Sequence, residues 1–345
     1  MSVQSRTTDD LDRLLRHRAG PLVQGGHASA VVAVAVREGR ESVVALGRTA
    51  WRGGHPTDPE TAFELGSLTK TFTGLLLAEM ATRGEVTLDD PVAAYLPCQA
   101  VPRDPAARRI TLRDLATYTS GLRRIPWAVT GEMMRSGLAN PYARYQEADL
   151  YRTTARMRTR RPPGSTVRYS TLGYGLLGQA LANAAGTDYP ALIQERICGP
   201  LAMTGTGTAP HREPAIGHRR RTPVPPWLFG ALAGAGALRS TGTDMLRYLR
   251  AQLAPEATPL ASALRLTHQA QAGPQTPAHH LAWFHYRAGG LTLLWLAGGT
   301  SGFTTFLGFS PASGAGVVLM ANVRASLRQP VLHAARKAFY DVALR

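Results

Sequence analysis

A serine and a lysine three positions apart, Ser67 and Lys70, are the residues best suited to covalent chemistry. A serine hydroxyl is a weak nucleophile unless a neighbour takes its proton, and that neighbour must be able to exist unprotonated. Lysine can lose its proton when it is desolvated or lies near other cations, whereas arginine cannot. On a helix this spacing puts both side chains on one face. The pair therefore predicts acyl transfer through Ser67.

The way the chain uses lysine strengthens this interpretation. Lys70 and Lys337 are the only lysines among 39 basic residues, so lysine stands at a position where arginine could not act. Chance would still place a serine three residues before one of two lysines in roughly one chain in ten. Apolar spacing predicts a helix over residues 67–83 that stops at Gly84. The free N–H groups and dipole at its start would favour an oxyanion there.

Two other segments carry candidate groups. Tyr169 could shuttle a proton between the serine and a leaving group if nearby cations lowered the pKa of its phenol, although a lone tyrosine more often serves in packing. The run Gly298-Gly299-Thr300-Ser301-Gly302 follows a predicted strand. Its glycines would let a backbone N–H approach a substrate carbonyl, but hairpin turns have the same composition.

The elements that must position these groups follow the order strands, helical middle, strands, helix. Strands are predicted over residues 28–36 and 42–51 as a hairpin, and over 280–287, 291–297, 303–310 and 314–321 as an antiparallel meander before a helix at 325–344. Helices are predicted over residues 9–17, 110–118, 174–185, 191–198 and 243–253. We expect an α/β sheet lobe from residues 1–88 and 230–345, a mostly helical lobe from 89–229, and the active site between them.

Composition favours a globular enzyme over a nucleic-acid binder. The net charge is +16, yet the arginines are scattered in short runs such as Arg123-Arg124, without zinc-finger spacing or an RNP-type aromatic string. An Arg-rich solvated surface explains the charge, and such a surface could dock an acidic protein. The first residues lack the apolar segment of a signal peptide, and no stretch has the length of a membrane span. We expect a cytoplasmic protein with no metal, no cofactor and no nucleic-acid partner.

Seven strings resemble, in family order, the serine β-lactamase and penicillin-binding-protein-like hydrolases, specifically the class C β-lactamase-related group. They are FELGSLTKTFTGLLLAEM, GEVTLDDPVAAYLP, ITLRDLATYTSGL, PPGSTVRYSTLGYGLLGQAL, GPLAMTGT, AGALRSTGTDMLRYL and AGGTSGFTTFLGFSP, spread over residues 63–323. This group includes family VIII esterases, D-amino-acid peptidases and amidases, and biosynthetic acyltransferases. The resemblance implies the β-lactamase/transpeptidase-like fold, in which an antiparallel sheet flanked by helices adjoins a mostly helical second lobe.

The resemblance also implies roles for individual residues. Ser67 would be the acylated nucleophile, Lys70 its helper and Tyr169 the tyrosine of the family's Y-x-N motif. Backbone N–H groups of Ser67 and Gly299 would form the oxyanion hole. Whether Lys70 or Tyr169 is the base during acylation stays open, because strongly coupled groups titrate as a set.

This sequence departs from the family pattern at substrate-binding positions. Thr171 stands where the Y-x-N motif has asparagine, and Leu296-Ala297-Gly298 replaces the third motif, K-T-G or H-x-G. A lost charged hydrogen bond to a ligand costs on the order of 1.5–3 kcal/mol, or about one to two decades of affinity. Other candidate substrate contacts are Thr300 and Tyr118, the latter at a place where relatives often have histidine and interpreted as either structural or cleft-lining.

We therefore expect an acyl-Ser67 intermediate formed from a small neutral ester, amide or thioester, by an esterase, an amidase or a biosynthetic acyltransferase. The acceptor would be water, an amine or an alcohol, and an acidic acyl-carrier domain could be the donor. The main alternative is a non-catalytic binding or sensor protein that kept the fold. A true β-lactamase or D,D-peptidase is less favoured because of the altered third motif.

Overall fold

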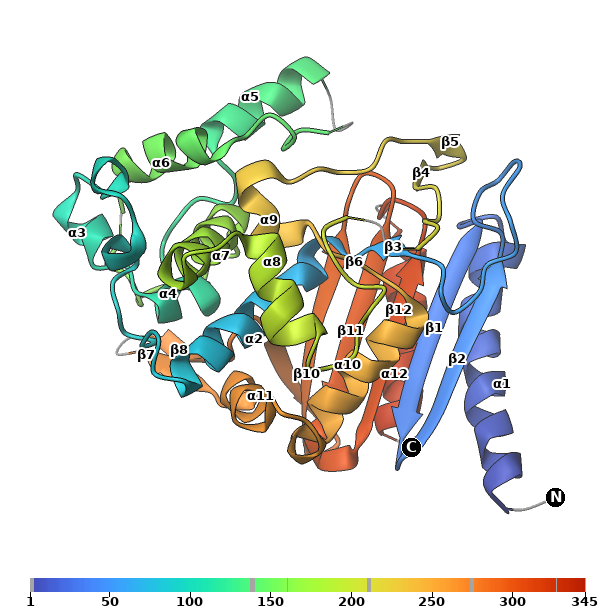
Figure 1. Ribbon diagram of the computed structural model, residues 1–345. Helices are drawn as coiled ribbons and strands as arrows, with labels where there is room; N and C mark the ends of the chain where they lie inside the picture. Colours follow the sequence, from blue (N-terminus) through green and yellow to red (C-terminus); the bar gives the residue numbers. More distant parts are fainter. Residues whose placement is uncertain are drawn as a thin grey trace.

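The centre of the molecule is a six-stranded antiparallel sheet with the strand order β2-β1-β12-β11-β10-β9 (Figure 1). The computed structural model describes residues 3–136, 140–159, 161–209, 212–273, 276–326 and 328–344. The sheet strands are β1 (Ala30–Arg37), β2 (Arg40–Gly47), β9 (Phe284–Ala288), β10 (Leu291–Gly299), β11 (Thr304–Ser310) and β12 (Ala315–Ala321). β1 pairs with both β2 and β12. Both ends of the chain thus build one sheet, as predicted, and β9 to β12 form the predicted meander.

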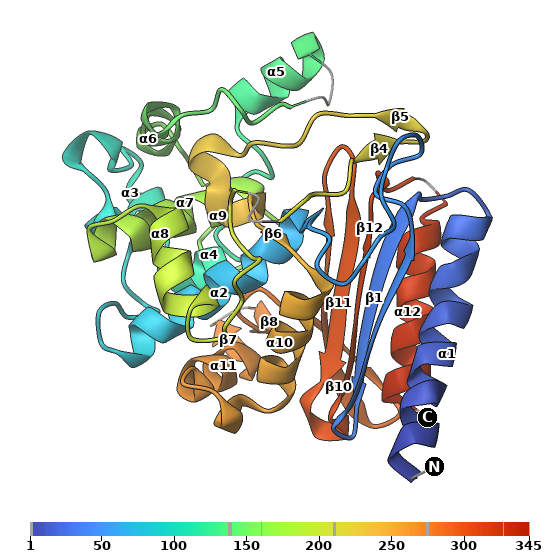
Figure 2. The same cartoon turned by 45° about the vertical axis from the view of Figure 1, so that its right-hand side comes forward.

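Helices cover both faces of this sheet, which explains why β1 is apolar along its length. Its side chains alternate between two cores, with Val32 and Val34 in one and Val31 and Ala33 in the other. Helices α1 (Val3–Gln24) and α12 (Pro330–Ala343) cover the second of these faces (Figure 2). Helices α2 (Thr69–Thr82) and α10 (Gly242–Leu253) lie on the other face. None of the helices described is long and apolar enough to cross a membrane.

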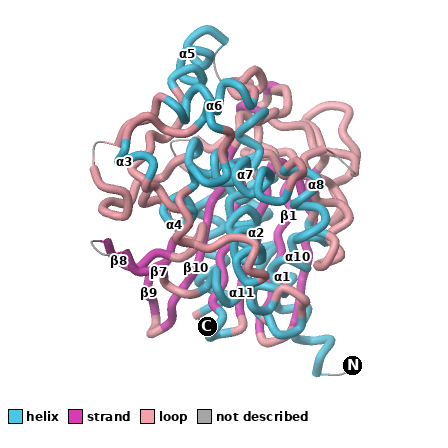
Figure 3. Tube along the Cα trace, turned by 60° about the vertical axis from the view of Figure 1, so that its left-hand side comes forward, coloured by secondary structure: helices cyan, strands magenta, loops and turns pink. Residues whose placement is uncertain are grey.

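The remaining helices gather on the α2 side, away from α1 and α12 (Figures 1 and 3). They are α3 (Pro105–Arg108), α4 (Leu112–Ala116), α5 (Trp127–Ser136), α6 (Glu147–Ala155), α7 (Thr171–Ala185), α8 (Tyr189–Ile193), α9 (Ala233–Gly236) and α11 (Ala261–His268). Three further pairs of short strands lie outside the six-stranded sheet: β3 (Phe63–Glu64) with β6 (Arg239–Ser240), β4 (His218–Arg219) with β5 (Thr222–Pro223), and β7 (Gln271–Gly273) with β8 (Thr276–His279). The lobe boundaries expected from the sequence stay a prediction.

Several elements differ from the prediction, three of them for identifiable reasons. Helix α1 is much longer than residues 9–17, because buried Ala19 and Leu22 continue its inward face. Helix α5 escaped prediction because it has no continuous buried stripe, and Trp127 is 77% exposed. Strand β9 begins only at Phe284, since Ala282 has a φ of +73° and interrupts extended backbone.

Candidate active site

Ser67 lies in a single turn of 3-10 helix (Gly66–Leu68) that leads directly into α2. This matches the predicted position at a helix start. Lys70 follows in the first turn of α2, and its Nζ lies 3.1 Å from Oγ of Ser67. The strand pair β3–β6 fixes the chain just before this turn, with Phe63 opposite Ser240. The structure therefore brings the predicted nucleophile and its helper into direct contact.

The side chain of Lys70 is completely buried. Its Nζ donates a hydrogen bond of 2.6 Å to the carbonyl of Ala235 in α9. Burial lowers the pKa of Lys70 well below its ordinary value, and the positive charge of Arg124 lowers it further. The neutral amine is thereby favoured. One N–H to Ala235 leaves the nitrogen lone pair available to the Ser67 hydroxyl.

Tyr169 completes the predicted triad of side chains. Lys70 Nζ lies 4.9 Å from the centroid of its ring. The next residue, Ser170, caps α7 by accepting a hydrogen bond of 2.8 Å from the N–H of Gly173, which fixes Tyr169 at the helix start. Burial raises the pKa of the Tyr169 phenol, while the Ser67 hydroxyl and Arg124 oppose that rise. The phenol is therefore neutral in the free protein.

Tyr118 packs against the ring of Tyr169. Its ring stacks on Tyr169 with centroids 5.1 Å apart and on Phe284 at 5.3 Å. Its hydroxyl donates a hydrogen bond of 2.9 Å to the carbonyl of Ala282. With only 1% of the residue exposed, Tyr118 has no surface through which to touch a substrate. The cleft-lining interpretation is thus corrected in favour of the structural one.

The turn around Ser67 touches the end of β10 through backbone atoms. Gly66 has a φ of +52°, and a Cβ added there would lie 2.8 Å from both N and O of Gly299. A Cβ at Gly298 would lie 2.1 Å from the carbonyl oxygen of Leu65. Only glycines allow this approach. The contact sets the segments carrying the N–H groups of Ser67 and Gly299 side by side, as an oxyanion hole requires.

The residues of the altered third motif point in different directions. Leu296 is 1% exposed and packs in the core that includes Leu65 and Leu68 beside Ser67. Ala297 packs in the core on the α12 side of the sheet, because neighbouring residues of a strand face opposite ways. Its side chain therefore points away from Ser67 and does not line the site as expected. Thr171, the first residue of α7, is also buried.

Glu64 is a buried residue near the site that the sequence reasoning missed. It lies three residues before Ser67, accepts a hydrogen bond of 3.0 Å from the N–H of Trp227, and sits 3.8 Å from Arg239. Burial raises the pKa of Glu64, and interactions with Thr300 and Arg239 partly offset that rise. Thr300 is 6% exposed. Its contact with Glu64 gives it a structural partner next to Gly299.

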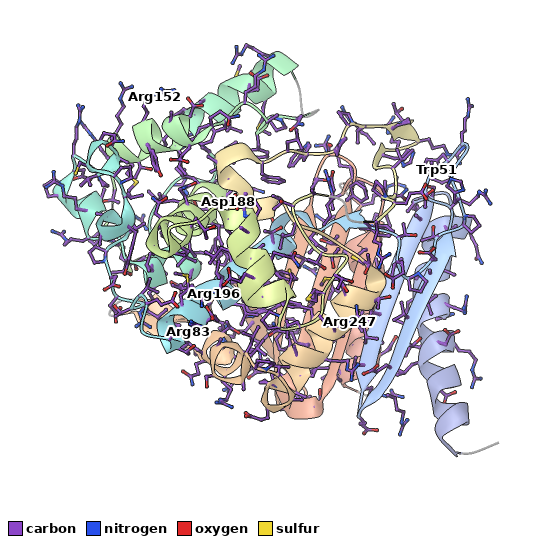
Figure 4. All side chains as sticks on the ribbon, viewed as in Figure 1. Trp51, Arg83, Arg152, Asp188, Arg196 and Arg247 are labelled. Atoms are coloured by element: carbon purple, nitrogen blue, oxygen red, sulfur yellow. The ribbon has the colours of Figure 1, made fainter. Side chains whose placement is uncertain are left out.

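Arg124 is the second residue that the sequence reasoning missed. Many arginines pair with acidic side chains: Arg196 with Glu79 and Glu85, Arg152 with Asp149, and Arg247 with Asp244. These three arginines are labelled in Figure 4. Arg124 instead lies over the ring of Tyr169, with its guanidinium carbon 5.8 Å from the ring centroid. Within the described part of the chain, no group of three or more His, Cys, Asp or Glu side chains could hold a metal ion.

Comparison with known proteins agrees with this geometry. The model of the Beta-lactamase family matches residues 11–340. The chain is 30% identical over 258 residues to the "D-alanyl-D-alanine-carboxypeptidase/endopeptidase AmpH" of Escherichia coli (strain K12), an alignment that covers 72% of this chain and 63% of that protein. It is 26% identical over 357 residues to a "Beta-lactamase" of the same organism, covering 88% of this chain and 86% of that one.

A solved structure described as "A class C beta-lactamase" superposes with a TM-score of 0.81, covering 95% of each chain at 21% sequence identity. That likeness establishes the fold, an α/β arrangement with an antiparallel sheet and many helices, as predicted. The family match spans nearly the whole chain. The chain belongs to the Beta-lactamase family, within the serine β-lactamase and penicillin-binding-protein-like superfamily of serine hydrolases.

Proposed function

We propose that this protein transfers acyl groups through a covalent acyl-Ser67 intermediate formed from a small neutral ester, amide or thioester. The observation that carries the proposal is the buried Lys70 amine 3.1 Å from Oγ of Ser67. A side chain held there without charge can accept the hydroxyl proton as Oγ attacks. The opposite pKa shifts of Lys70 and Tyr169 favour Lys70 as the base during acylation.

The reaction proceeds in two steps, acylation and deacylation of Ser67. In acylation, Oγ of Ser67 bonds to the acyl carbon, Lys70 takes the hydroxyl proton, and N–H groups of Ser67 and Gly299 stabilise the oxyanion. Collapse of the tetrahedral intermediate breaks the bond to the leaving group. The leaving group departs with the proton that Lys70 took, delivered through Tyr169. In deacylation, water, an amine or an alcohol attacks the same carbon, the bond from that carbon to Oγ breaks, and Oγ of Ser67 receives the proton that the acceptor gives up.

The neutral donor is inferred from what surrounds the serine. Leu296 puts a hydrocarbon side chain at the position where the family's third motif has a cation. Thr171 puts a hydroxyl where the Y-x-N motif has the asparagine amide. Neither can hold a substrate carboxylate by charge. A peptidase or β-lactamase activity, suggested by the names of the relatives, is the competing candidate. The chain spans 63% of the length of the carboxypeptidase/endopeptidase it resembles.

Transfer to an amine or alcohol is the second part of the proposal. An acyl-enzyme partitions according to which acceptor reaches it first. The net charge of +16 would attract an acidic acyl-carrier domain as donor. A cytoplasmic location belongs to the same proposal.

Labelling with a fluorophosphonate tests the nucleophile. We expect one adduct, located on Ser67 by peptide mass spectrometry and lost in Ser67→Ala. No adduct on the parent protein would favour a non-catalytic binding or sensor protein instead.

Substrate assays then test the donor class. The parent should turn over a short aryl ester or acyl thioester much faster than a β-lactam or a D-Ala-D-Ala peptide, and added amines should yield conjugate. The reverse preference would refute the neutral donor, and free acid as the sole product at every amine concentration would refute transfer.

A further inference from the structure

The proposed chemistry needs a neutral Lys70, and a nearby positive charge helps to keep it so. In this chain the third-motif position next to the nucleophile turn is Leu296, a buried hydrocarbon. Any additional cation at the site must therefore come from another segment. The only described cation whose charge lowers the pKa of Lys70 is Arg124, from the segment between α4 and α5.

The backbone of Arg124 is bonded to α7, the helix that begins two residues after Tyr169. Its carbonyl accepts hydrogen bonds from the N–H groups of Thr171 (2.8 Å) and Leu172 (3.2 Å), the first residues of α7. Its guanidinium carbon is 5.8 Å from the centroid of the Tyr169 ring, and Lys70 Nζ is 4.9 Å from the same centroid. The side chains of Lys70 and Arg124 thus share one aromatic neighbour, and the backbone of Arg124 is held at the start of α7 while its side chain is exposed.

The charge of Arg124 is not cancelled by a carboxylate. Across the described ranges, no Asp or Glu oxygen lies within 4.0 Å of its guanidinium. Its neighbour Arg123 lies elsewhere: that guanidinium is 3.4 Å over the ring of Trp127 and interacts electrostatically with Arg168. The two adjacent arginines therefore have separate surroundings, and Arg124 is the one directed at the site.

We propose that Arg124 is a positioning residue that supplies, from the helical side of the site, the positive charge missing at Leu296 and thereby sets the protonation of Lys70 and Tyr169. This inference rests on the proposed acyl transfer through Ser67. Arg124 acts through these two side chains and need not touch the substrate. Removing its charge makes Lys70 easier to protonate, so fewer molecules carry the free amine at a given pH.

Other titratable groups face Lys70 and Tyr169, and these groups are the same in the parent and in the Arg124 variants. Tyr174 of α7 lies 5.8 Å from Lys70 Nζ, measured to its ring centroid, and Tyr118 stacks on Tyr169. Tyr142 acts electrostatically on Tyr169. All three are phenols whose pKa is raised by burial, so they are uncharged at neutral pH. Arg124 is the charged neighbour whose substitution changes the electrostatics of the site.

The test is the pH dependence of kcat/KM for a neutral aryl ester. The acid limb reports deprotonation of the base in the free enzyme. Arg124→Gln removes one positive charge from the surroundings of Lys70. The midpoint of the acid limb should therefore move upward by about one pH unit. Arg124→Lys restores the charge and should return the limb to within about 0.3 units of the parent. Arg123→Gln, the matched control, should leave it in place.

The outcomes separate this inference from the function on which it rests. If the parent labels at Ser67 and the limb of Arg124→Gln coincides with that of the parent, the inference is wrong while the function stands. The same holds if Arg124→Gln raises KM for an anionic ester alone, because Arg124 would then bind substrate charge. If the parent neither labels nor turns over ester, the proposed function itself fails.

Discussion

Lys70 is the residue whose chemistry depends most on its surroundings. Its amine is buried between the Ser67 hydroxyl and the Ala235 carbonyl. Lys70→Met replaces it with an unbranched side chain that fills a similar space, so the fold should survive. Loss of a general base typically costs 10²–10⁴-fold in rate. We expect fluorophosphonate labelling of Ser67 to slow by about that factor, measured against the parent at pH 8.

Two variants make this prediction specific. In Lys70→Arg the guanidinium stays protonated and cannot accept the Ser67 proton, so this variant should also label slowly. Lys337→Met removes the only other lysine, which is exposed on α12, and should label like the parent. Parental labelling by Lys70→Met, with its thermal unfolding unchanged, would show that Lys70 is not the base.

The site could be predicted from the sequence only where its residues are neighbours in the chain. Ser67 and Lys70 lie one helical turn apart, so their spacing pointed to the pair and the family resemblance turned it into an assignment. Tyr169 needed the family resemblance, because nothing local marks a tyrosine that reaches a distant serine. Arg124 and Glu64 were missed, since their importance comes from contacts across the fold and from burial. Ala297 was assigned to the site although the alternation of β10 turns it to the other face.

At the scale of elements, the contact between β10 and the nucleophile turn is the most constrained feature. A Cβ on Gly298 would lie 2.1 Å from the Leu65 carbonyl oxygen and 2.4 Å from Thr305 Oγ1, so Gly298→Ala must push the two segments apart. We expect a loss of about 1–3 kcal/mol in the free energy of unfolding, measured in urea. We also expect kcat to fall by about 10²-fold, because the oxyanion donors move out of position.

A glycine with room around it provides the control. A Cβ added at Gly131 in α5 would meet no heavy atom within 4 Å, and alanine is the better helix former. Gly131→Ala should therefore stabilise the protein by about 0.5–1 kcal/mol and leave kcat unchanged. If Gly298→Ala behaves like Gly131→Ala, the close backbone contact does not exist in solution.

Periodicity served well for elements with one dominant buried pattern and poorly for the others. The strands β10, β11 and β12 were predicted within two residues, because each is a short apolar run bounded by Gly or Ser. Helix α6 was not predicted. Its start depends on side chains at Gln146 and Asp149 that cap the backbone, and few of its residues are buried. Such a helix is held by its ends and its neighbours more than by an apolar stripe.

At the scale of the whole molecule, the sheet unites the first and last parts of the chain. The ion pair between Arg18 of α1 and Asp341 of α12, 2.5 Å apart, joins the two ends a second time. The order of strands and helices predicted that the first and last parts of the chain build one sheet. It could not predict which side chains would meet where the sheet edge lies next to α11, and there the buried His280 lies beside His268, the partly buried His279 and the exposed His285.

We expect two of these histidines, His268 and His280, to make global stability depend on pH. Burial lowers the pKa of His268 and of His280 to about 4, with neighbouring histidines adding to the effect. Between pH 6.5 and 4 the unfolded chain binds protons that the folded protein does not, so stability present above pH 6.5 is lost as the pH falls through this window. By pH 4 the titration of His280 lowers the free energy of unfolding by on the order of 2 kcal/mol.

His280→Asn isolates that contribution. Nδ1 of His280 donates to the carbonyl of His268 at 2.8 Å, and an asparagine amide can supply a donor at that place without titrating. Urea unfolding at a series of pH values should give the variant a shallower fall in the free energy of unfolding between pH 6.5 and 4. At pH 7.5 parent and variant should agree within about 1 kcal/mol, since the histidine is then neutral in both states. Equal slopes below pH 6.5 would mean that His280 titrates alike in the folded and unfolded protein, and that acid sensitivity arises elsewhere in the fold.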